Sequence, residues 1–331
     1  MSQLLNETFQ KHLKRLKKDL LIESDEISPT PSDVLTPEVK QEFWGDFKST
    51  SVKDFVEKYG SKMTDPKFHA FITAGVADGI HDENFTVSQF SPKASELVPT
   101  QNEIGFGNSI DDLIKVTFNE GTQLEELKKI LDGNNVMLGA GKSGTKIPVV
   151  VFADKYIIDG HHRWSKISCG NKDAKIACLN FNNPNLKGNV GMALKAFHLA
   201  IAQILSKFPV SDKSGDNLMT SDTKTVSSYV NKNITSKFSE VYKTEKQLPD
   251  NESIAKYISE NASSTIIGKQ GAADGGNLSR KYMPQTDQAP AYQAGLEKGE
   301  INFFYDTLTE KMVNETFQRH LTLLYKKLKL N

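Results

Sequence analysis

The chain has 331 residues, of which 37% are hydrophobic and 25% are charged, a composition typical of globular proteins with a substantial core. Basic and acidic residues both number 41, and a net charge of zero argues against a dedicated non-specific DNA-binding protein. The only cysteines are Cys169 and Cys178, and no apolar run approaches the roughly 20 residues of a membrane span. We therefore expect a soluble protein in a reducing, intracellular compartment.

The first and last stretches of the chain repeat one amphipathic pattern. Residues 5–13 read LNETFQKHL and residues 313–321 read VNETFQRHL, with apolar residues at matching offsets in both copies. The spacing predicts a helix with one narrow apolar stripe and basic residues on its other faces. Three interpretations stay open: helices that pack within the chain, a docking peptide for another protein (residues 4–21 and 312–329), or helices on an anionic membrane surface.

Composition and periodicity divide the chain into five segments. Each terminal segment is one copy of the amphipathic helix. Between them we expect a linker with short helices, a small mixed-sheet α+β domain, and a helical region that contains a glycine-rich loop at 264–290. The corresponding limits are 1–24, 25–85, 86–182, 183–300 and 301–331.

Short helices are predicted in the segment 25–85. Prolines and serines at 28–32 indicate a linker. Thr36 and Pro37 are typical of a helix start, Ser51 of a second, and Pro66 of a third that runs to Ala77.

From Thr86 the pattern changes to short apolar runs separated by turns and polar stretches. A strand is predicted over 86–90, followed by a helix over 110–118 that is capped by Ser109 and carries Phe118 on its apolar face. A second helix is predicted over 123–131. Further apolar runs predict strands over 148–152, 156–158 and 176–179, with a helix over 165–169.

Residues 139–144 read GAGKSG. These letters match part of a dinucleotide-binding or phosphate-loop pattern, but the surrounding sequence does not fit either one. A dinucleotide fingerprint follows a strand and opens a helix, whereas this run leads directly into the strand at Pro148. The phosphate-loop pattern also needs glycine where Val136 stands. We interpret the run as a mobile glycine loop that can lie over a ligand.

The segment 183–300 is predicted to be mainly helical. A strong apolar stripe runs from Met192 to Phe208, and further helices are expected over 225–243 and 253–261. The glycine-rich loop that follows contains Arg280 and Lys281. Arg280 is a candidate to reach an anion in the site, although a solvated loop is the simpler interpretation.

The candidate site is the hexad Asp159–Trp164, which lies where an apolar run meets a helical pattern. Gly160 permits a close turn, backbone N–H groups at a helix start favour an anion, and Arg163 can grip phosphate or carboxylate. His161 or His162 can transfer a proton near neutral pH, and Asp159 can orient a histidine or hold Mg²⁺. Adjacent histidines point apart, so we expect no structural metal, and spacing supports no serine triad.

Residues 157–164, IIDGHHRW, resemble the phosphate box of the ParB/sulfiredoxin-like superfamily, which includes ParB-like nuclease domains. Residues 98–104, VPTQNEI, resemble its upstream box, and residues 148–152 the strand between the two. The resemblance covers 86–182 and implies a small α+β domain that holds nucleotide phosphates. Gly160, His162 and Arg163 match closely enough to inherit phosphate binding. Sulfiredoxins need a cysteine at position 161, so the resemblance does not extend to their reductase activity.

Two functions are expected from this resemblance and from the terminal repeat. In the first, the domain binds a nucleotide (CTP or ATP with Mg²⁺) or a nucleic-acid phosphate, with nuclease, nucleotide hydrolase or kinase-like phosphotransfer activity. In the second, the chain is a non-enzymatic virion or assembly protein that docks through its terminal helices. The repeat and the helical surroundings resemble tailed-phage proteins, which implies the cytoplasm of an infected bacterial host or the virion as location.

Overall fold

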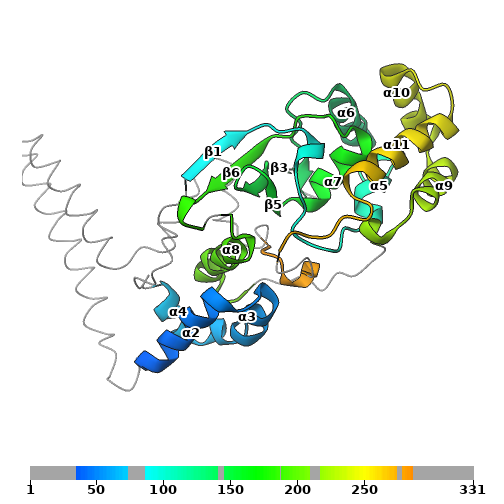
Figure 1. Cartoon of the computed structure of the whole chain (residues 1–331). Coiled ribbons are helices and arrows are strands. Elements are labelled where there is room, and N and C mark those ends of the chain that lie inside the picture. The colour runs from blue at the N-terminus through cyan, green and yellow to red at the C-terminus, as the bar shows by residue number, and fades with distance from the viewer. Residues whose placement is uncertain are drawn as a thin grey trace, which may run out of the picture. The chain divides into compact units, whose positions relative to one another are not determined.

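A computed structural model describes residues 35–73, 86–140, 145–186, 188–208, 217–273 and 278–285 (Figure 1). The chain forms two compact units, Met1–Glu42 and Phe43–Asn331. Helix α2 (Pro37–Ser49) begins in the first unit and continues into the second. The two terminal helices predicted at 1–24 and 301–331, and the linker at 28–32, lie outside the described residues.

The second unit contains a four-stranded mixed sheet in the order β1-β6-β4-β5 (Figure 1). Strand β6 pairs antiparallel with β1 and parallel with β4, and β4 pairs antiparallel with β5. All four strands fall within the segment 86–182. Their bounds are Thr86–Phe90 for β1, Val149–Phe152 for β4, Tyr156–Asp159 for β5 and Cys178–Asn182 for β6.

The hairpin between β4 and β5 explains why these two apolar runs pair. Ala153 and Asp154 both adopt positive φ, of 53° and 58°, which matches the right-handed twist of a tight hairpin. The Asn180 side chain holds this turn, since its Oδ1 accepts from Asp154 N at 2.9 Å and its Nδ2 donates to Asp154 Oδ1 at 2.8 Å. Strand β4 is buried along its whole length, as expected of a central strand.

Three helices pack with one another, and one of them, α7, also packs on strand β4 of the sheet. They are α5 (Phe106–Ile114), α6 (Glu120–Asp132) and α7 (His161–Gly170). Gly170 allows α7 to approach α6 closely, because a Cβ there would lie 2.6 Å from Ile130 Cγ2. Helices α9 (Thr223–Asn233), α10 (Ser236–Lys246) and α11 (Asn251–Thr265) extend the same core, in which Trp164 is fully buried.

A second, aromatic cluster joins α2, α3 (Val52–Tyr59), α4 (Pro66–Thr73) and α8 (Val190–Leu205). The ring of Phe43 packs against those of Phe55 and Phe68, each with a centroid separation of 5.4 Å. Helix α8 also contacts the sheet, where the rings of Phe197 and Phe181 meet edge to face at 5.1 Å. These contacts place both clusters within one compact unit.

The mixed helix-and-sheet architecture confirms the predicted α+β class. Helix starts at Ser51 and Pro66 are confirmed, and the Ser51 side chain accepts from Asp54 N as a helix cap. The five predicted segment limits stay predictions.

Three predicted elements are wrong in their bounds. Helix α5 begins after Gly105 and ends at Ile114, so Ser109 is an interior residue that bonds to Gly105 O, and Phe118 is 69% exposed. The helix predicted over 225–243 is two helices, because the chain is extended at Ile234 and Thr235. Helix α7 spans His161–Gly170 rather than 165–169, so residues 161–164 of the hexad are helical.

Candidate anion site at the corner of β5 and α7

The candidate site lies where strand β5 ends and helix α7 begins. Gly160 occupies the N-cap position with φ of 92°, in the left-handed region that glycine adopts without strain. Because glycine has no side chain, the N-cap residue provides no capping hydrogen-bond partner for the first N–H groups of α7. This end of the helix dipole favours an anion. A Cβ at Gly160 would lie 2.7 Å from Arg163 Nη2, so glycine also makes room for the guanidinium group.

Arg163 is held across this corner by two acceptors. Its Nη2 donates to Asp159 Oδ2 at 3.2 Å and to the carbonyl oxygen of Pro148 at 3.3 Å. Its Nε is buried and has no hydrogen-bond acceptor among the described residues. A buried guanidinium N–H without an acceptor costs free energy, and an anionic oxygen is the acceptor that fits it best.

The upstream segment 98–105 runs along the free edge of β5 and contacts both histidines. Val98 forms a parallel bridge with Tyr156. The backbone N–H of Thr100 then donates to His161 Nε2 at 3.1 Å, and that of Gly105 donates to His162 Nε2 at 3.2 Å. Each Nε2 therefore acts as an acceptor, which places the proton of the neutral ring on Nδ1.

The two histidines differ in burial and therefore in chemistry. His161 is 5% exposed, and burial is the main cause that holds the pKa of His161 well below its usual range, with His162, Arg280 and Arg163 adding positive charge nearby. His161 is consequently neutral at physiological pH and serves as an anchor for Thr100. His162 is only partly buried, so it is the better placed of the two to meet a ligand.

Arg280 approaches this corner from a distant part of the sequence. It begins the 3-10 turn η8 (Arg280–Tyr282), within a segment of residues 278–285 that we name the strap. The hydroxyl of Thr100 lies 3.9 Å from Met283 Sδ, so the strap and His161 share Thr100 as a neighbour. The positive charge of Arg280 contributes to the low pKa of His161, after burial and the charge of His162.

Lys166, which lies one helical turn after His162 in α7, was not identified as a site residue from the sequence. Its Nζ is paired with Glu126 Oε2 at 2.9 Å and with Asp112 Oδ2 at 3.4 Å. Glu126 also accepts from the backbone N–H of Gly139 at 3.1 Å. The start of the predicted glycine loop is thereby tied to α7 through Glu126, whereas residues 141–144 lie outside the described residues.

Sequence reasoning also missed Thr100, Gly105 and Glu103 as contributors to the corner. Thr100 and Glu103 lie in the box identified at 98–104, and Gly105 directly follows it, but nothing in the composition of this stretch indicates which atoms face the histidines. The local signal in this segment is Pro99, since the residue before a proline, here Val98, favours an extended backbone.

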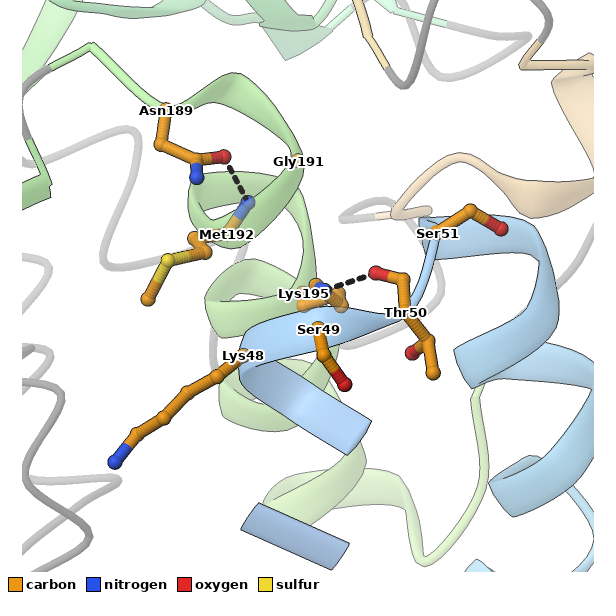
Figure 2. Close-up of a pocket in the computed structure, with 8 residues that line it drawn as sticks. All are labelled: Lys48, Ser49, Thr50, Ser51, Asn189, Gly191, Met192 and Lys195. Atoms are coloured by element: carbon orange, nitrogen blue, oxygen red, sulfur yellow. Dashed lines mark hydrogen bonds between the residues drawn. The ribbon is translucent and has the colours of Figure 1, made fainter. Parts of the chain in front are cut away.

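A separate polar cavity of about 360 Å³ lies between α2, α3 and the start of α8 (Figure 2). Figure 2 shows Lys195 donating to the carbonyl oxygen of Thr50, at 2.6 Å, while Asn189 caps α8 by accepting from Met192 N. Lys195 is only 2% exposed and also lies over the rings of Phe47 and Phe55. These contacts give Lys195 a structural role at the end of α2, and none of the hexad residues lines this cavity.

Within the described ranges, no helix combines the length and apolar character needed to cross a bilayer. Those ranges also bring together no group of three or more His, Cys, Asp or Glu side chains able to hold a metal ion. Both cysteines are buried, and burial raises the pKa of the Cys178 thiol to about 12. Neither thiol is therefore set up as a nucleophile.

The fold and the corner define an α+β protein with an arginine–aspartate ion pair at a strand-to-helix turn. Comparison of the chain with protein-family models, curated proteins and solved structures found no match. The resemblance to the ParB/sulfiredoxin-like superfamily therefore stays a prediction that rests on residues 98–104 and 157–164.

Proposed function

We propose that the corner of β5 and α7 binds the phosphate of a nucleotide or of a nucleic acid. Arg163 is the main ligand, Gly160 gives the phosphate access to the first N–H groups of α7, and His162 and Arg280 line the same site. The observation that carries the proposal is the Nε of Arg163, which is buried beside an uncapped helix start and lacks an acceptor among the described residues. An oxyanion would satisfy both features at once.

Chemistry on the bound phosphate would need a proton acceptor or a metal ion. His161 is held neutral with its Nε2 already engaged by Thr100 N, so it supports the site rather than the reaction. His162 and Asp159 are the remaining predicted catalytic groups, and each would first have to give up a bond, because Nε2 of His162 accepts from Gly105 N and Asp159 is paired with Arg163. Magnesium would enter with CTP or ATP, as it usually keeps phosphate oxygens and waters among its ligands, and Asp159 is the carboxylate at the corner.

Calorimetric titration of the full chain with CTP and with ATP, each with and without Mg²⁺, tests this proposal. We expect Arg163→Ala to weaken binding by about tenfold or more, since hydrogen bonds to charged groups contribute about 1.5–3 kcal/mol. Lys128→Ala is the matched control, because it removes one positive charge from the exposed face of α6, away from the corner. Equal affinities of the two variants, or no heat with any nucleotide and no binding of single-stranded DNA or RNA, would overturn the proposal.

The duplicated sequence at the two ends supports a second function, docking to another protein. Residues 4–21 and 312–329 carry matching apolar stripes, and two copies raise the effective concentration at a multivalent partner such as a capsid or assembly component. Deleting residues 1–23 and 313–331 together would abolish association with such a partner, measured by co-sedimentation with assembled particles. Unchanged association after the double deletion would remove this function.

A further inference from the structure

The strap, residues 278–285, lies outside the segment that resembles a known family, yet it is bonded to that segment at several points. Asn102 N donates to the carbonyl oxygen of Leu278 at 2.8 Å. Just before the strap, Gly271 N donates to Asn102 Oδ1, and Ala272 N donates to Pro99 O. A Cβ at Gly271 would lie 2.8 Å from Thr100 O, so the two backbones are in close contact.

The Glu103 carboxylate is bonded to Arg280 and to the residue before it. Its Oε2 accepts from the Ser279 hydroxyl at 3.2 Å and from the backbone N–H of Arg280 at 3.1 Å. A carboxylate beside an anion site weakens binding through like-charge repulsion. We therefore interpret Glu103 as a residue that holds the turn beginning at Arg280, rather than as a ligand of the anion.

The other side of the strap is bonded to the helices of the aromatic cluster. His198 Nε2 lies 2.7 Å from the carbonyl oxygen of Tyr282, and the Tyr282 hydroxyl donates to Glu57. Met283 contacts the Thr100 hydroxyl, which in turn donates to Ile157 O on β5 at 2.5 Å. The strap is thus fixed from both sides, and η8 is fixed relative to the corner.

We propose that the strap forms one wall of the phosphate site, with Arg280 as its second arginine ligand and Glu103 as the residue that positions it. This inference rests on the proposed function, because it assumes that the corner binds phosphate. Arg163 and Arg280 come from separate segments, so together they suit a ligand with at least two linked phosphate groups. Inorganic pyrophosphate is the simplest probe of that arrangement.

The role of Arg280 is tested by titrating the full chain with pyrophosphate. We expect Arg280→Ala to weaken binding by about tenfold, as loss of one charge-assisted contact does. Lys281→Ala is the matched control, since it removes the same charge from the neighbouring residue, whose ammonium lies 4.7 Å from the centroid of the Tyr282 ring. Equal effects of the two substitutions, or no binding of pyrophosphate by the wild type, would overturn the inference.

The role of Glu103 is tested by comparing two substitutions that remove the same negative charge. Glu103→Gln keeps an oxygen acceptor for Ser279 and Arg280, and we expect binding within about twofold of wild type. Glu103→Ala removes the acceptor, and we expect binding about fivefold weaker than in Glu103→Gln. If the carboxylate acted only by repulsion, Glu103→Ala would bind pyrophosphate as tightly as Glu103→Gln, and the positioning role would be wrong.

The phosphate site at the corner and the role of the strap as its wall can be rejected independently. Loss of binding in Arg163→Ala together with unchanged binding in Arg280→Ala and Glu103→Ala would retain the phosphate site and reject the strap as its wall. Unchanged binding in Arg163→Ala would reject the proposed corner itself. Because Glu103 is exposed, thermal unfolding of the Gln and Ala variants serves as the check that both remain folded.

Discussion

The backbone N–H of Thr100 donates a hydrogen bond of 3.1 Å to Nε2 of His161, which lies 61 positions further along the chain. This bond ties the upstream segment to the first residue of α7 and requires an unprotonated Nε2. Burial, together with the positive charges of His162, Arg280 and Arg163, lowers the pKa of His161 in the same direction. The geometry and the electrostatics therefore agree on a neutral ring.

Nitrogen NMR of the histidine rings can check this assignment. We expect Nε2 of His161 to keep the chemical shift of an unprotonated ring nitrogen from pH 7 to pH 5.5, where an ordinary histidine becomes charged. The matched substitution Thr100→Pro, which removes the backbone N–H donor, should shift this resonance. An imidazolium signal for His161 at pH 6 would contradict the neutral assignment.

A second buried histidine, His198, should make the stability of the fold depend on pH. Burial lowers the pKa of His198 from 6.5 to about 4 in the folded state. The unfolded chain therefore binds a proton first, so this contribution is fully present above about pH 6.5 and is lost as the pH falls toward 4. The difference corresponds to about 3 kcal/mol, and the lowered pKa of His161 acts in the same direction.

Urea unfolding at pH 7.5 and pH 4.5 measures that loss. His198→Asn keeps a donor for the Tyr282 carbonyl oxygen but cannot titrate, so we expect its loss of stability between the two pH values to be about 2–3 kcal/mol smaller than that of the wild type. Equal losses in the two proteins would show that His198 is not a source of the pH dependence.

Gly160→Ala should impair the corner in two ways. The added Cβ would displace the guanidinium of Arg163, and alanine is strained at a φ of 92°. We expect a destabilisation of about 1–3 kcal/mol in thermal unfolding together with weaker nucleotide binding. Gly188→Ala is the matched control, since φ is 76° there and nothing lies within 4 Å of the added Cβ. If both variants bind nucleotide equally well, the close contact of Gly160 with Arg163 is not needed for nucleotide binding.

Lys195→Ala should destabilise the protein by about 2–4 kcal/mol, because it leaves a cavity and removes the bond to Thr50 O. Lys48 lines the same cavity but is exposed, so we expect Lys48→Ala to change the free energy of unfolding by less than about 0.5 kcal/mol. Urea unfolding of both variants measures the contrast. A small effect of Lys195→Ala would mean that the carbonyl groups at the end of α2 do not depend on this ammonium group.

Local pattern predicts the four strands of the mixed sheet and the position of the hexad between β5 and α7, because both depend on short-range signals. The β4–β5 hairpin follows from two apolar runs on either side of a three-residue turn, and Ser51 begins α3 through its own side chain. The start of α5 could not be predicted, since Ser109 looks like a cap but bonds Ser165 inside the core. Phe118 looks like a core residue by spacing, yet Lys115 is extended and ends the helix before it.

The partners of the hexad could not be predicted because they are distant in sequence. His162 meets Gly105 across 57 positions, and Glu103 meets Arg280 across 177. No periodicity or spacing rule links such pairs, since they are set by how the whole chain packs. The phosphate-binding roles of Gly160, His162, Arg163 and Arg280 stay predictions until a ligand is tested.

Tyr282 has one further consequence for how this protein should be dissected. Its carbonyl oxygen is bonded to His198 and its hydroxyl to Glu57, two residues outside the segment 86–182. A fragment trimmed to 86–182 would keep Asp159, Gly160 and Arg163 but would lose both helices that hold the strap. The proposed phosphate site should therefore be tested on the full chain, because in such a fragment the contacts of Tyr282 with His198 and Glu57 are absent.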